Sequence, residues 1–321
     1  MYTLKKRVFA IILVLISLLF VGCKNNKVEG FVGAYVKFID VGQGDCILIN
    51  LPDDKKVMID TGNGTKQSDN AIKESLSNLN VKTIDYLILT HPDQDHVGGA
   101  KMIAEDYKVV NAFVPYITQM MLPNFLSYSE VYNTMEEKGV KNQTSVIGTH
   151  LKGDGYFLAF LTPYAFAQQG SSYEDLNKED ATDKQINDSS PILYLEIYGK
   201  RFIFTGDAGV SQEKIVLENF NAGFYQIVFN RQIDIRNVDF LKVAHHGSSD
   251  CSSSEFLNML RPYGAVISVG GNNYYGHPDT ELLTRLINCN DGINIYRTDT
   301  CGSIAVRVED NGQMTVITEA D

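Results

Sequence analysis

The sequence predicts a single α/β domain over residues 34–321. Short apolar runs such as 46–49 and 56–60 are followed by glycine or aspartate, as expected of buried strands joined by tight turns. Apolar residues at helical spacing follow in segment 68–79. Strand-like and helix-like segments continue to the C-terminus without a break in composition. We therefore expect one domain with two similar α/β halves.

One long segment lacks this pattern. Residues 171–190 are polar and acidic without an apolar period, so we expect a surface loop there. The remaining expected strands are 36–40, 85–90, 111–115, 157–161, 192–198, 200–204, 240–244, 265–269, 293–296 and 304–308, and the remaining helices are 124–138, 212–220, 253–260 and 280–287.

The first 22 residues are typical of an export signal. A basic start precedes an apolar run of 14 residues, 8–21, which is short of the roughly 20 residues of a membrane span. The run ends in a sequence that resembles a bacterial lipobox at Cys23. We expect a signal peptide at 1–22, a lipidated tether at 23–33, and an exported protein anchored on the extracytoplasmic face of the cell membrane. A cleaved soluble form and an uncleaved anchor are the alternatives.

Charge and cysteine content narrow the function. Residues 23–321 contain 25 basic and 39 acidic residues, a net charge of −14, which disfavours extended non-specific contacts with nucleic acid. This charge does not exclude a small phosphodiester held by metal ions. The later cysteines form no CxxC pair, so a thiolate zinc site is not expected. Cys289 and Cys301 could pair across neighbouring strands, although buried or free thiols are favoured.

Side chains of the kind that bind metals cluster directly after strand 85–90. His91, Asp93, Asp95 and His96 lie within six residues, and two glycines follow that would let a helix begin close by. Neutral imidazole and carboxylate are the ligands that zinc, manganese and iron take from proteins. We predict a site for one or two divalent metal ions, and a merely solvated polar loop is the weaker alternative.

Later strand ends carry further candidates. Asp207 follows an apolar strand and would either bind metal, which we favour, or cap the next helix. His245 and His246 follow another strand, and we expect one to be a ligand and the other to contact substrate, with His246 slightly favoured as the ligand. His277 would lie either against the substrate or in a surface turn. His150 lies outside any motif and is expected on the surface.

Other catalytic classes lack their motifs. The chain contains no G-x-S-x-G elbow, no P-loop and no G-x-G-x-x-G that opens a helix. Segment 41–45 is too short to be a nucleotide-binding fingerprint.

Together these segments resemble the metallo-β-lactamase superfamily, and in particular the soluble hydrolase-like domain of ComEC-type DNA-uptake (competence) proteins. The resemblance implies an αββα four-layer sandwich with the metal site at the edge of two packed sheets. The segments that carry it span nearly all of the mature chain and are 38–45, 59–62, 91–99, 187–190, 205–207, 241–248, 275–278 and 296–299.

The resemblance also implies the roles of individual residues. Asp207 would bridge two metals, and Asp60 would orient a ligand histidine. Where the superfamily usually has two further histidines, this chain has Asp93 and either Asn187 or Ser189, so the first metal site should favour manganese or stay empty. The ligands would be His91 at the first metal, Asp95, His96 and His246 (or His245) at the second, with Asp93 and Asp207 completing the set.

We expect these residues to form the site of a metal-dependent hydrolase, with Zn²⁺ or Mn²⁺ as the cofactor. A bound metal lowers the pKa of water from about 15.7 to about 7 and neutralises charge on a phosphoryl oxygen. Asp95, His245 and His277 are the expected catalytic residues.

The expected substrate is a phosphodiester. The resemblance suggests DNA, whereas the charge favours a smaller ester or single-stranded ends, and we expect a monomer. The alternatives are another hydrolase, such as a cell-wall phosphocholine esterase or a lactamase, and a catalytically silent lipoprotein that assists DNA uptake.

Overall fold

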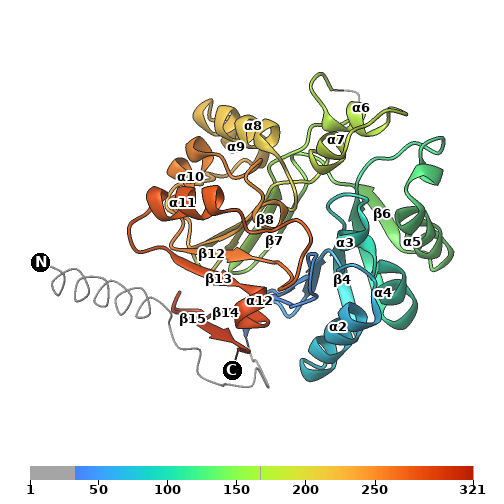
Figure 1. The fold of residues 1–321 in the computed structure, drawn as a ribbon, viewed down its shortest axis with the longest axis horizontal. Coiled ribbons are helices and arrows are strands. Elements are labelled where there is room, and N and C mark those ends of the chain that lie inside the picture. The colour runs from blue at the N-terminus through green and yellow to red at the C-terminus, as the bar shows by residue number, and fades with distance from the viewer. Residues whose placement is uncertain (1–32, 167, 321) are drawn as a thin grey trace, which may run out of the picture.

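The computed structural model describes residues 33–166 and 168–320 (Figure 1). The predicted signal peptide and the tether up to residue 32, with Cys23, lie outside these residues. Within the described ranges, none of the helices combines the length and the apolar character that a membrane crossing requires.

Eight strands form the first sheet, in the order β15-β14-β1-β2-β3-β4-β5-β6. The run from β3 to β6 is parallel, so the carboxyl ends of these strands meet at one edge of the sheet. The strands are β1 (Ala34–Phe38), β2 (Ile47–Asn50), β3 (Lys56–Ile59), β4 (Thr83–Ile88), β5 (Lys108–Val114), β6 (Lys141–Thr144), β14 (Ile304–Val308) and β15 (Met314–Thr318).

Seven strands form the second sheet, in the order β13-β12-β11-β10-β9-β8-β7. Here β10 to β13 are parallel, which again brings their carboxyl ends to one edge. The strands are β7 (His150–Gly153), β8 (Tyr156–Phe160), β9 (Leu193–Ile197), β10 (Lys200–Phe204), β11 (Phe240–Lys242), β12 (Gly264–Ile267) and β13 (Asn294–Arg297).

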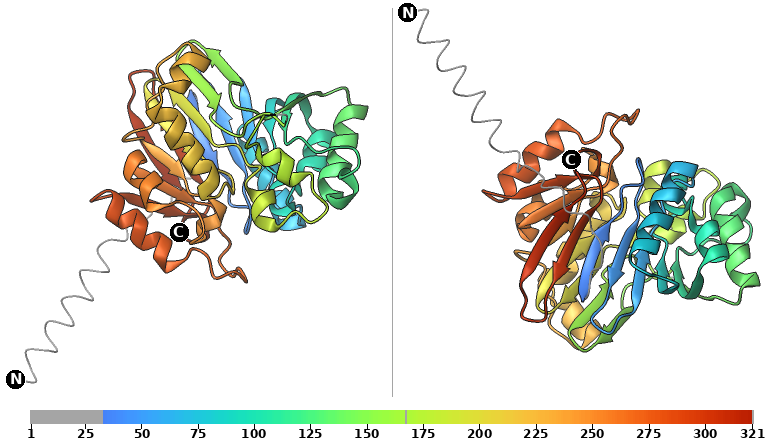
Figure 2. Two further views of the ribbon diagram at one scale, coloured as in Figure 1. Left: turned by 90° about the horizontal axis from the view of Figure 1, so that it is seen from above. Right: turned by 90° about the horizontal axis from the view of Figure 1, so that it is seen from below.

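Helices cover the outer face of each sheet, and Figure 2 shows the resulting four layers from two further sides. The layers confirm the expected αββα sandwich. The first sheet is covered by α2 (Lys66–Asn78), α4 (Ala100–Asp106) and α5 (Leu126–Glu137). The second is covered by α8 (Val210–Asn221), α9 (Phe224–Phe229), α10 (Ser254–Leu260) and α11 (Thr280–Cys289).

Successive side chains along a strand point to opposite faces of the sheet, so the apolar residues form three cores. One core lies between the two sheets, and one lies between each sheet and its helices. On β10, Phe202 and Phe204 face the first sheet, whereas Ile203 between them packs under the helices of the second. On β1, Phe38 joins the core between the sheets and Tyr35 joins the core under α2, α4 and α5. The inner strands are therefore buried on both faces, which explains their nearly continuous apolar sequences.

The predicted surface loop at 171–190 is wrong. This segment contains α6 (Ser172–Leu176) and α7 (Asp183–Asn187), and Tyr173 in α6 is fully buried with its hydroxyl donating to the Ser145 carbonyl at 2.6 Å. A capping box between Thr182 and Gln185 begins α7. Both helices are too short to show an apolar period, so tertiary contacts decide their conformation.

Smaller differences have similar causes. The strands β6, β7 and β15 were not expected because they are polar or lie at sheet edges, where apolar alternation is weak. His150 is exposed on β7, as expected. The Cys289–Cys301 disulfide is not formed, and the Cys289 thiol is buried and donates to the Leu286 carbonyl.

We expect Phe202→Ala to destabilise the fold by about 3–5 kcal/mol, because this buried ring stacks between Phe204 and Phe240 in the core between the sheets. Urea denaturation followed by circular dichroism measures the change in the free energy of unfolding. Ile227→Ala, at a side chain that is 79% exposed, is the control and should change it by less than about 0.5 kcal/mol. Equal effects of the two substitutions would contradict the assignment of the central core.

Candidate metal centre

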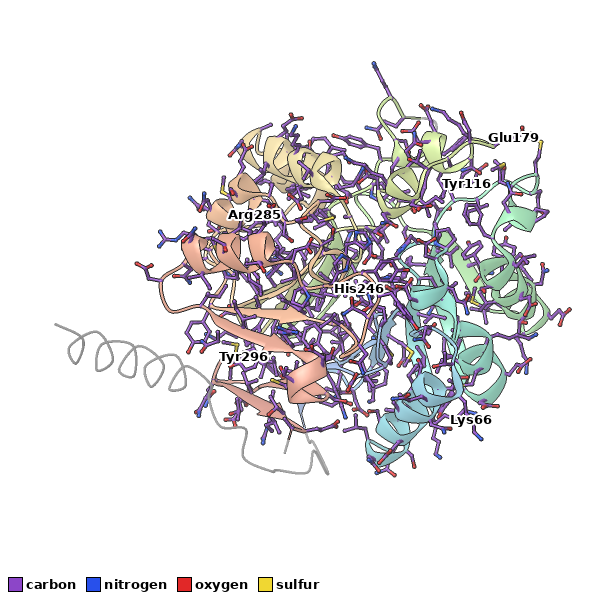
Figure 3. The ribbon with its side chains drawn as sticks, viewed as in Figure 1. Lys66, Tyr116, Glu179, His246, Arg285 and Tyr296 are labelled. Carbon is purple, nitrogen blue, oxygen red and sulfur yellow. The ribbon has the colours of Figure 1, made fainter. Side chains whose placement is uncertain are left out.

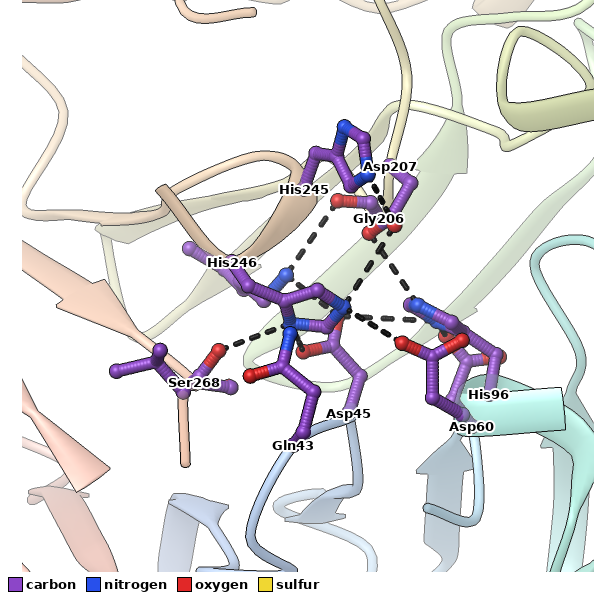
Figure 4. Close-up of polar contacts among 12 residues, drawn as sticks. Gln43, Asp45, Asp60, His96, Gly206, Asp207, His245, His246 and Ser268 are labelled. Atoms are coloured by element: carbon purple, nitrogen blue, oxygen red, sulfur yellow. Dashed lines mark hydrogen bonds and ion pairs between the residues drawn. The ribbon is translucent and has the colours of Figure 1, made fainter. Parts of the chain in front are cut away.

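In each sheet the parallel strands end at one edge, and these two edges face each other. This arrangement brings the predicted residues together. Figure 3 shows His246 near the middle of the molecule, with Lys66 and Arg285 in opposite outer layers. Figure 4 shows Asp60 and His96 from the first half opposite Asp207 and His246 from the second. Segments more than 100 residues apart therefore form one site.

Backbone hydrogen bonds join the loops of the first half around this site. The Asp45 amide donates to the Asp95 carbonyl at 3.1 Å, and the Thr61 amide donates to the His96 carbonyl at 2.7 Å. Gly44, at φ +133°, lies so close that a Cβ there would collide with the Asp95 carbonyl oxygen. The turn at 42–45 therefore supports the loop that carries the candidate metal-binding side chains.

Asp60 orients His96, as the resemblance implied. The Asp60 carboxylate accepts hydrogen bonds from the Thr90 amide at 2.8 Å and the Thr90 hydroxyl at 2.7 Å, and it lies 2.8 Å from His96 Nδ1. This contact fixes the His96 ring and turns its Nε2 towards the centre of the site. A carboxylate behind a ligand histidine is a common arrangement in metal centres.

One group of possible ligands joins the two halves of the chain. His246 Nε2 lies 3.2 Å from Asp95 Oδ2, and atoms of Asp95, His96 and His246 lie within 4.8 Å of one another. The His246 ring is held from behind, because its Nδ1 lies 2.9 Å from the Ser268 carbonyl oxygen. These three side chains correspond to the predicted second metal site.

A second group lies beside the first. His91 Nε2 is 3.5 Å from Asp93 Oδ2 and 4.0 Å from Asp207 Oδ2. Asp207 also lies 3.3 Å from His96 Nε2 and 3.6 Å from His246 Nε2, so its two oxygens contact both groups. This position between the groups suits a bridging carboxylate. All six predicted ligands therefore lie in one cluster.

The cluster carries strongly paired charges. Burial opposes ionisation of Asp207, but His96 and His246 more than offset it and hold the pKa of that carboxyl well below its usual range. Burial likewise disfavours a charged His96, yet Asp207, Asp60 and Asp95 raise its pKa well above the ordinary value. A metal binds neutral imidazole, so metal binding would compete with protons at His96.

Buried polar atoms without a hydrogen-bond partner indicate whether these residues suit a metal. Within the described residues, His91 Nε2, His96 Nε2, His246 Nε2 and Asp207 Oδ1 are buried and have no hydrogen-bond partner. Leaving a buried polar atom unsatisfied costs about 1–3 kcal/mol. One or two divalent cations would satisfy these atoms, and this mixed nitrogen and oxygen set suits zinc or manganese.

His246 and His245 occupy different positions. The His246 side chain is almost fully buried in the cluster, whereas that of His245 is 31% exposed and lies 3.8 Å from Asp207. Both residues have left-handed φ angles, 49° and 51°, which cost about 1–3 kcal/mol each outside glycine and are concentrated at functional sites. The geometry favours His246 as the ligand. His245 lies at the solvent-exposed margin of the cluster, which we call the rim.

His277 lies at the rim beside His245, with ring centroids 5.6 Å apart. Burial lowers the pKa of both imidazoles, opposed at His245 by Asp207 and reinforced at His277 by His245. Neutral imidazoles at the rim can donate or accept a proton near neutral pH. Of the two candidates in the middle slot, the Asn187 amide oxygen faces His245 Nε2 at 3.5 Å and the amide nitrogen donates to Asp93 Oδ2 at 3.3 Å, whereas the Ser189 hydroxyl donates to the Ile186 carbonyl.

Sequence reasoning did not assign a supporting role to Ser190, Lys242 or Asp45. The Ser190 hydroxyl lies 3.1 Å from His91 Nδ1 and 3.3 Å from the Asp207 amide, although it lies in the segment expected to be a surface loop. The fully buried Lys242 ammonium lies 2.5 Å from Asp45 Oδ2 and so links the two sheets. A lysine inside the apolar strand 240–244 was the available signal for this ion pair.

Comparison with known proteins agrees with this geometry. A family model described as the metallo-beta-lactamase superfamily matches residues 39–271. ComE operon protein 3 of Bacillus subtilis (strain 168) is 31% identical over 290 residues, 85% of this chain and 33% of that protein. Competence protein ComA of Neisseria gonorrhoeae is 28% identical over 271 residues, 84% of this chain and 32% of that protein. The chain thus spans about a third of the length of these relatives.

A solved structure supports the fold alone. The crystal structure of CmlA, a diiron β-hydroxylase from Streptomyces venezuelae, has a TM-score of 0.52 at 13% identity and covers 87% of this chain and 55% of its own. The family match extends from the end of β1 past β12 and includes every residue of the cluster. The chain therefore belongs to the metallo-beta-lactamase superfamily, and its sequence is similar to competence proteins.

Proposed function

We propose that this protein is a metal-dependent phosphodiesterase. The observation that carries the proposal is that candidate ligand atoms from both sheets converge in the interior. Within the described residues these atoms are buried and have no hydrogen-bond partner, and two further histidines lie beside them at the solvent-exposed rim. Members of this superfamily are mostly hydrolases, and its fold binds one or two metal ions. Two adjoining ligand groups that share Asp207 suit a reaction in which both the attacking and the leaving oxygen carry charge.

The residues divide into ligands and their supports. His91, Asp93 and Asp207 would hold one ion, and Asp95, His96 and His246 with Asp207 would hold the other. When bound, the metal supplies an acidified water and neutralises charge on the phosphoryl group. Asp60 and Ser190 keep the rings of His96 and His91 in place. The protein thus contributes a rigid and preorganised site.

Three side chains would act on the substrate itself. His245 and His277 face the rim, where they would donate hydrogen bonds to phosphoryl oxygens. Asp95 lies 3.2 Å from His246 and is only partly buried, so in addition to ligation it would accept a proton near the attacking oxygen. Hydrolysis would join the oxygen of water to phosphorus and break the bond to the leaving alkoxide, which would take up the proton that the water gave to Asp95.

The relatives suggest the setting in which this activity is used. Competence protein ComA carries competence in its name, and ComE operon protein 3 is likewise a ComEC-type competence protein, so we propose a role in DNA uptake. The predicted export signal and the lipobox-like sequence at Cys23 support a location on the outer face of the cell membrane. With a net charge of −14, the mature protein would act on single-stranded ends rather than along a duplex.

A substrate panel tests the proposal. Protein that starts after Cys23 is incubated with Mn²⁺ or Zn²⁺ and a panel of bis(p-nitrophenyl) phosphate, DNA, a phosphocholine ester, a carboxylic ester and a lactam. Turnover of the diester that EDTA abolishes and added metal restores supports the proposal. Turnover of the lactam, carboxylic ester or phosphocholine ester alone indicates another hydrolase. Metal binding without any turnover indicates a catalytically silent binding protein.

We expect Asp207→Asn to lower kcat/KM for bis(p-nitrophenyl) phosphate by more than about 100-fold, because the loss of even a supporting contact costs 10- to 100-fold. Initial rates at saturating Mn²⁺ measure this effect. Asp154→Asn, in the turn between β7 and β8 at the opposite edge of the second sheet, is the matched control. A rate for Asp207→Asn close to that of the control would rule out a bridging carboxylate.

We expect Asp60→Asn to weaken metal affinity by about 10- to 100-fold, because the charged hydrogen bond to His96 Nδ1 is lost while the shape of the side chain is kept. Competition with a fluorescent chelator measures the affinity, and circular dichroism verifies that the variant is folded. Unchanged affinity in a folded variant would show that Asp60 does not orient a ligand.

We expect His246→Ala and His245→Ala to differ. The buried His246 lies among the ligands, so its loss should reduce the number of metal ions bound and the activity together. His245→Ala should keep the metal content and lower kcat, because His245 lies at the rim. Metal content by inductively coupled plasma spectrometry and steady-state kinetics separate the two effects. The reverse pattern would assign the ligand to His245.

A further inference from the structure

Two adjacent tyrosines project from the loop that joins β12 to α11 beside the site. Tyr274 is fully exposed and Tyr275 is 72% exposed. Large aromatic side chains are rarely left in water next to one another without a binding role. Neither ring contributes to one of the three cores.

The loop is held in place by one side chain. Asn273 Nδ2 donates to the Gly270 carbonyl at 2.9 Å and to the His277 carbonyl at 2.8 Å, and Asn273 Oδ1 accepts from the His277 amide at 2.9 Å. These bonds close the loop on both sides of the tyrosines. The two rings are therefore presented by a closed turn, which reduces the entropy lost when they bind a ligand.

A row of rings connects Tyr275 to the candidate metal centre. The Tyr275 ring stacks on the His277 ring, with centroids 5.6 Å apart and planes at 22°. The His277 ring lies 5.6 Å from that of His245, whose Nε2 is 3.8 Å from Asp207. Tyr275 is thus the outward continuation of the rim where the scissile phosphate would lie.

We propose that Tyr274 and Tyr275 form a stacking platform for the nucleobases of single-stranded nucleic acid. This inference rests on the proposed phosphodiesterase function and names its substrate class. A base that stacks on the platform would leave the adjoining phosphate beside His277 and His245. Aromatic side chains hold single strands through the π-face that every base has, so the platform requires no sequence preference.

Stacking also accounts for recognition by an acidic protein. The mature chain carries a net charge of −14, which opposes binding through long runs of phosphate contacts. A π-face attracts a base without a basic groove, and the bases of a duplex are already stacked on each other. The platform would therefore select unpaired ends over double-stranded DNA.

The test compares equilibrium binding of two probes to the protein that starts after Cys23. One is a fluorescein-labelled single-stranded pentathymidylate, and the other is the same backbone without bases. EDTA prevents cleavage, and fluorescence anisotropy measures Kd. We expect the wild type to bind the base-bearing probe more tightly. Tyr274→Leu/Tyr275→Leu should weaken that binding by about ten-fold or more and remove the difference between the probes.

Two matched variants separate stacking from other effects. Tyr274→Phe/Tyr275→Phe keeps both rings and should retain the preference for bases. Tyr263→Leu removes a tyrosine that is 58% exposed at the opposite edge of the second sheet and should bind like the wild type. Equal binding of the two probes by the wild type, or a Leu double variant that still prefers bases, would overturn the platform.

Two further measurements make the outcomes distinguishable. Turnover of bis(p-nitrophenyl) phosphate with Mn²⁺ tests the proposed function separately, so turnover without a preference for bases refutes the platform alone. A preference for bases that depends on the tyrosine rings supports the platform even where no diester is turned over. Co-sedimentation with phosphatidylglycerol vesicles that the Leu double variant loses, together with equal binding of the two probes, would assign the tyrosines to a membrane surface and overturn the proposal.

Discussion

The site depends on one constraint, which is that a carboxylate buried away from water must be paired or hydrogen-bonded. Asp45, Asp60 and Asp207 are almost fully buried where the two sheets meet. Lys242 pairs with Asp45, Thr90 and His96 hold Asp60, and the ligand histidines surround Asp207. The Lys242–Asp45 pair and the contacts of Asp207 with His91 and His96 also bring the two halves together. Structure and binding capacity therefore have a common physical origin.

The parallel parts of the two sheets put these acids within reach of each other. Strands β3 to β5 end at one edge of the first sheet, and β10 to β12 end at the facing edge of the second. The residues that follow each strand therefore point into one region although they are far apart in sequence. The core between the sheets holds this alignment because it is filled by side chains from both of them.

The interior and the rim of the site have different properties. The six candidate ligands lie in a charge-paired cluster that is mostly closed to water, which fixes their positions. The rim carries His245, His277 and the loop of residues 271–278, all more open to solvent. Rigid ligands with an accessible rim allow a superfamily to keep its metal chemistry while its substrates differ, because selectivity lies in the loops.

The sequence alone predicted most of the strands, the longest helices and the six candidate ligands, because apolar runs and strand-end acids and histidines are local patterns. Only the tertiary structure decided which of His245 and His246 lies among the candidate ligands, since both follow the same strand and only their burial and contacts distinguish them. It also decided that residues 171–190 fold into helices and that Ser190 contacts His91, and it paired Lys242 with Asp45. These features depend on contacts between residues that are distant in sequence, which no local pattern contains.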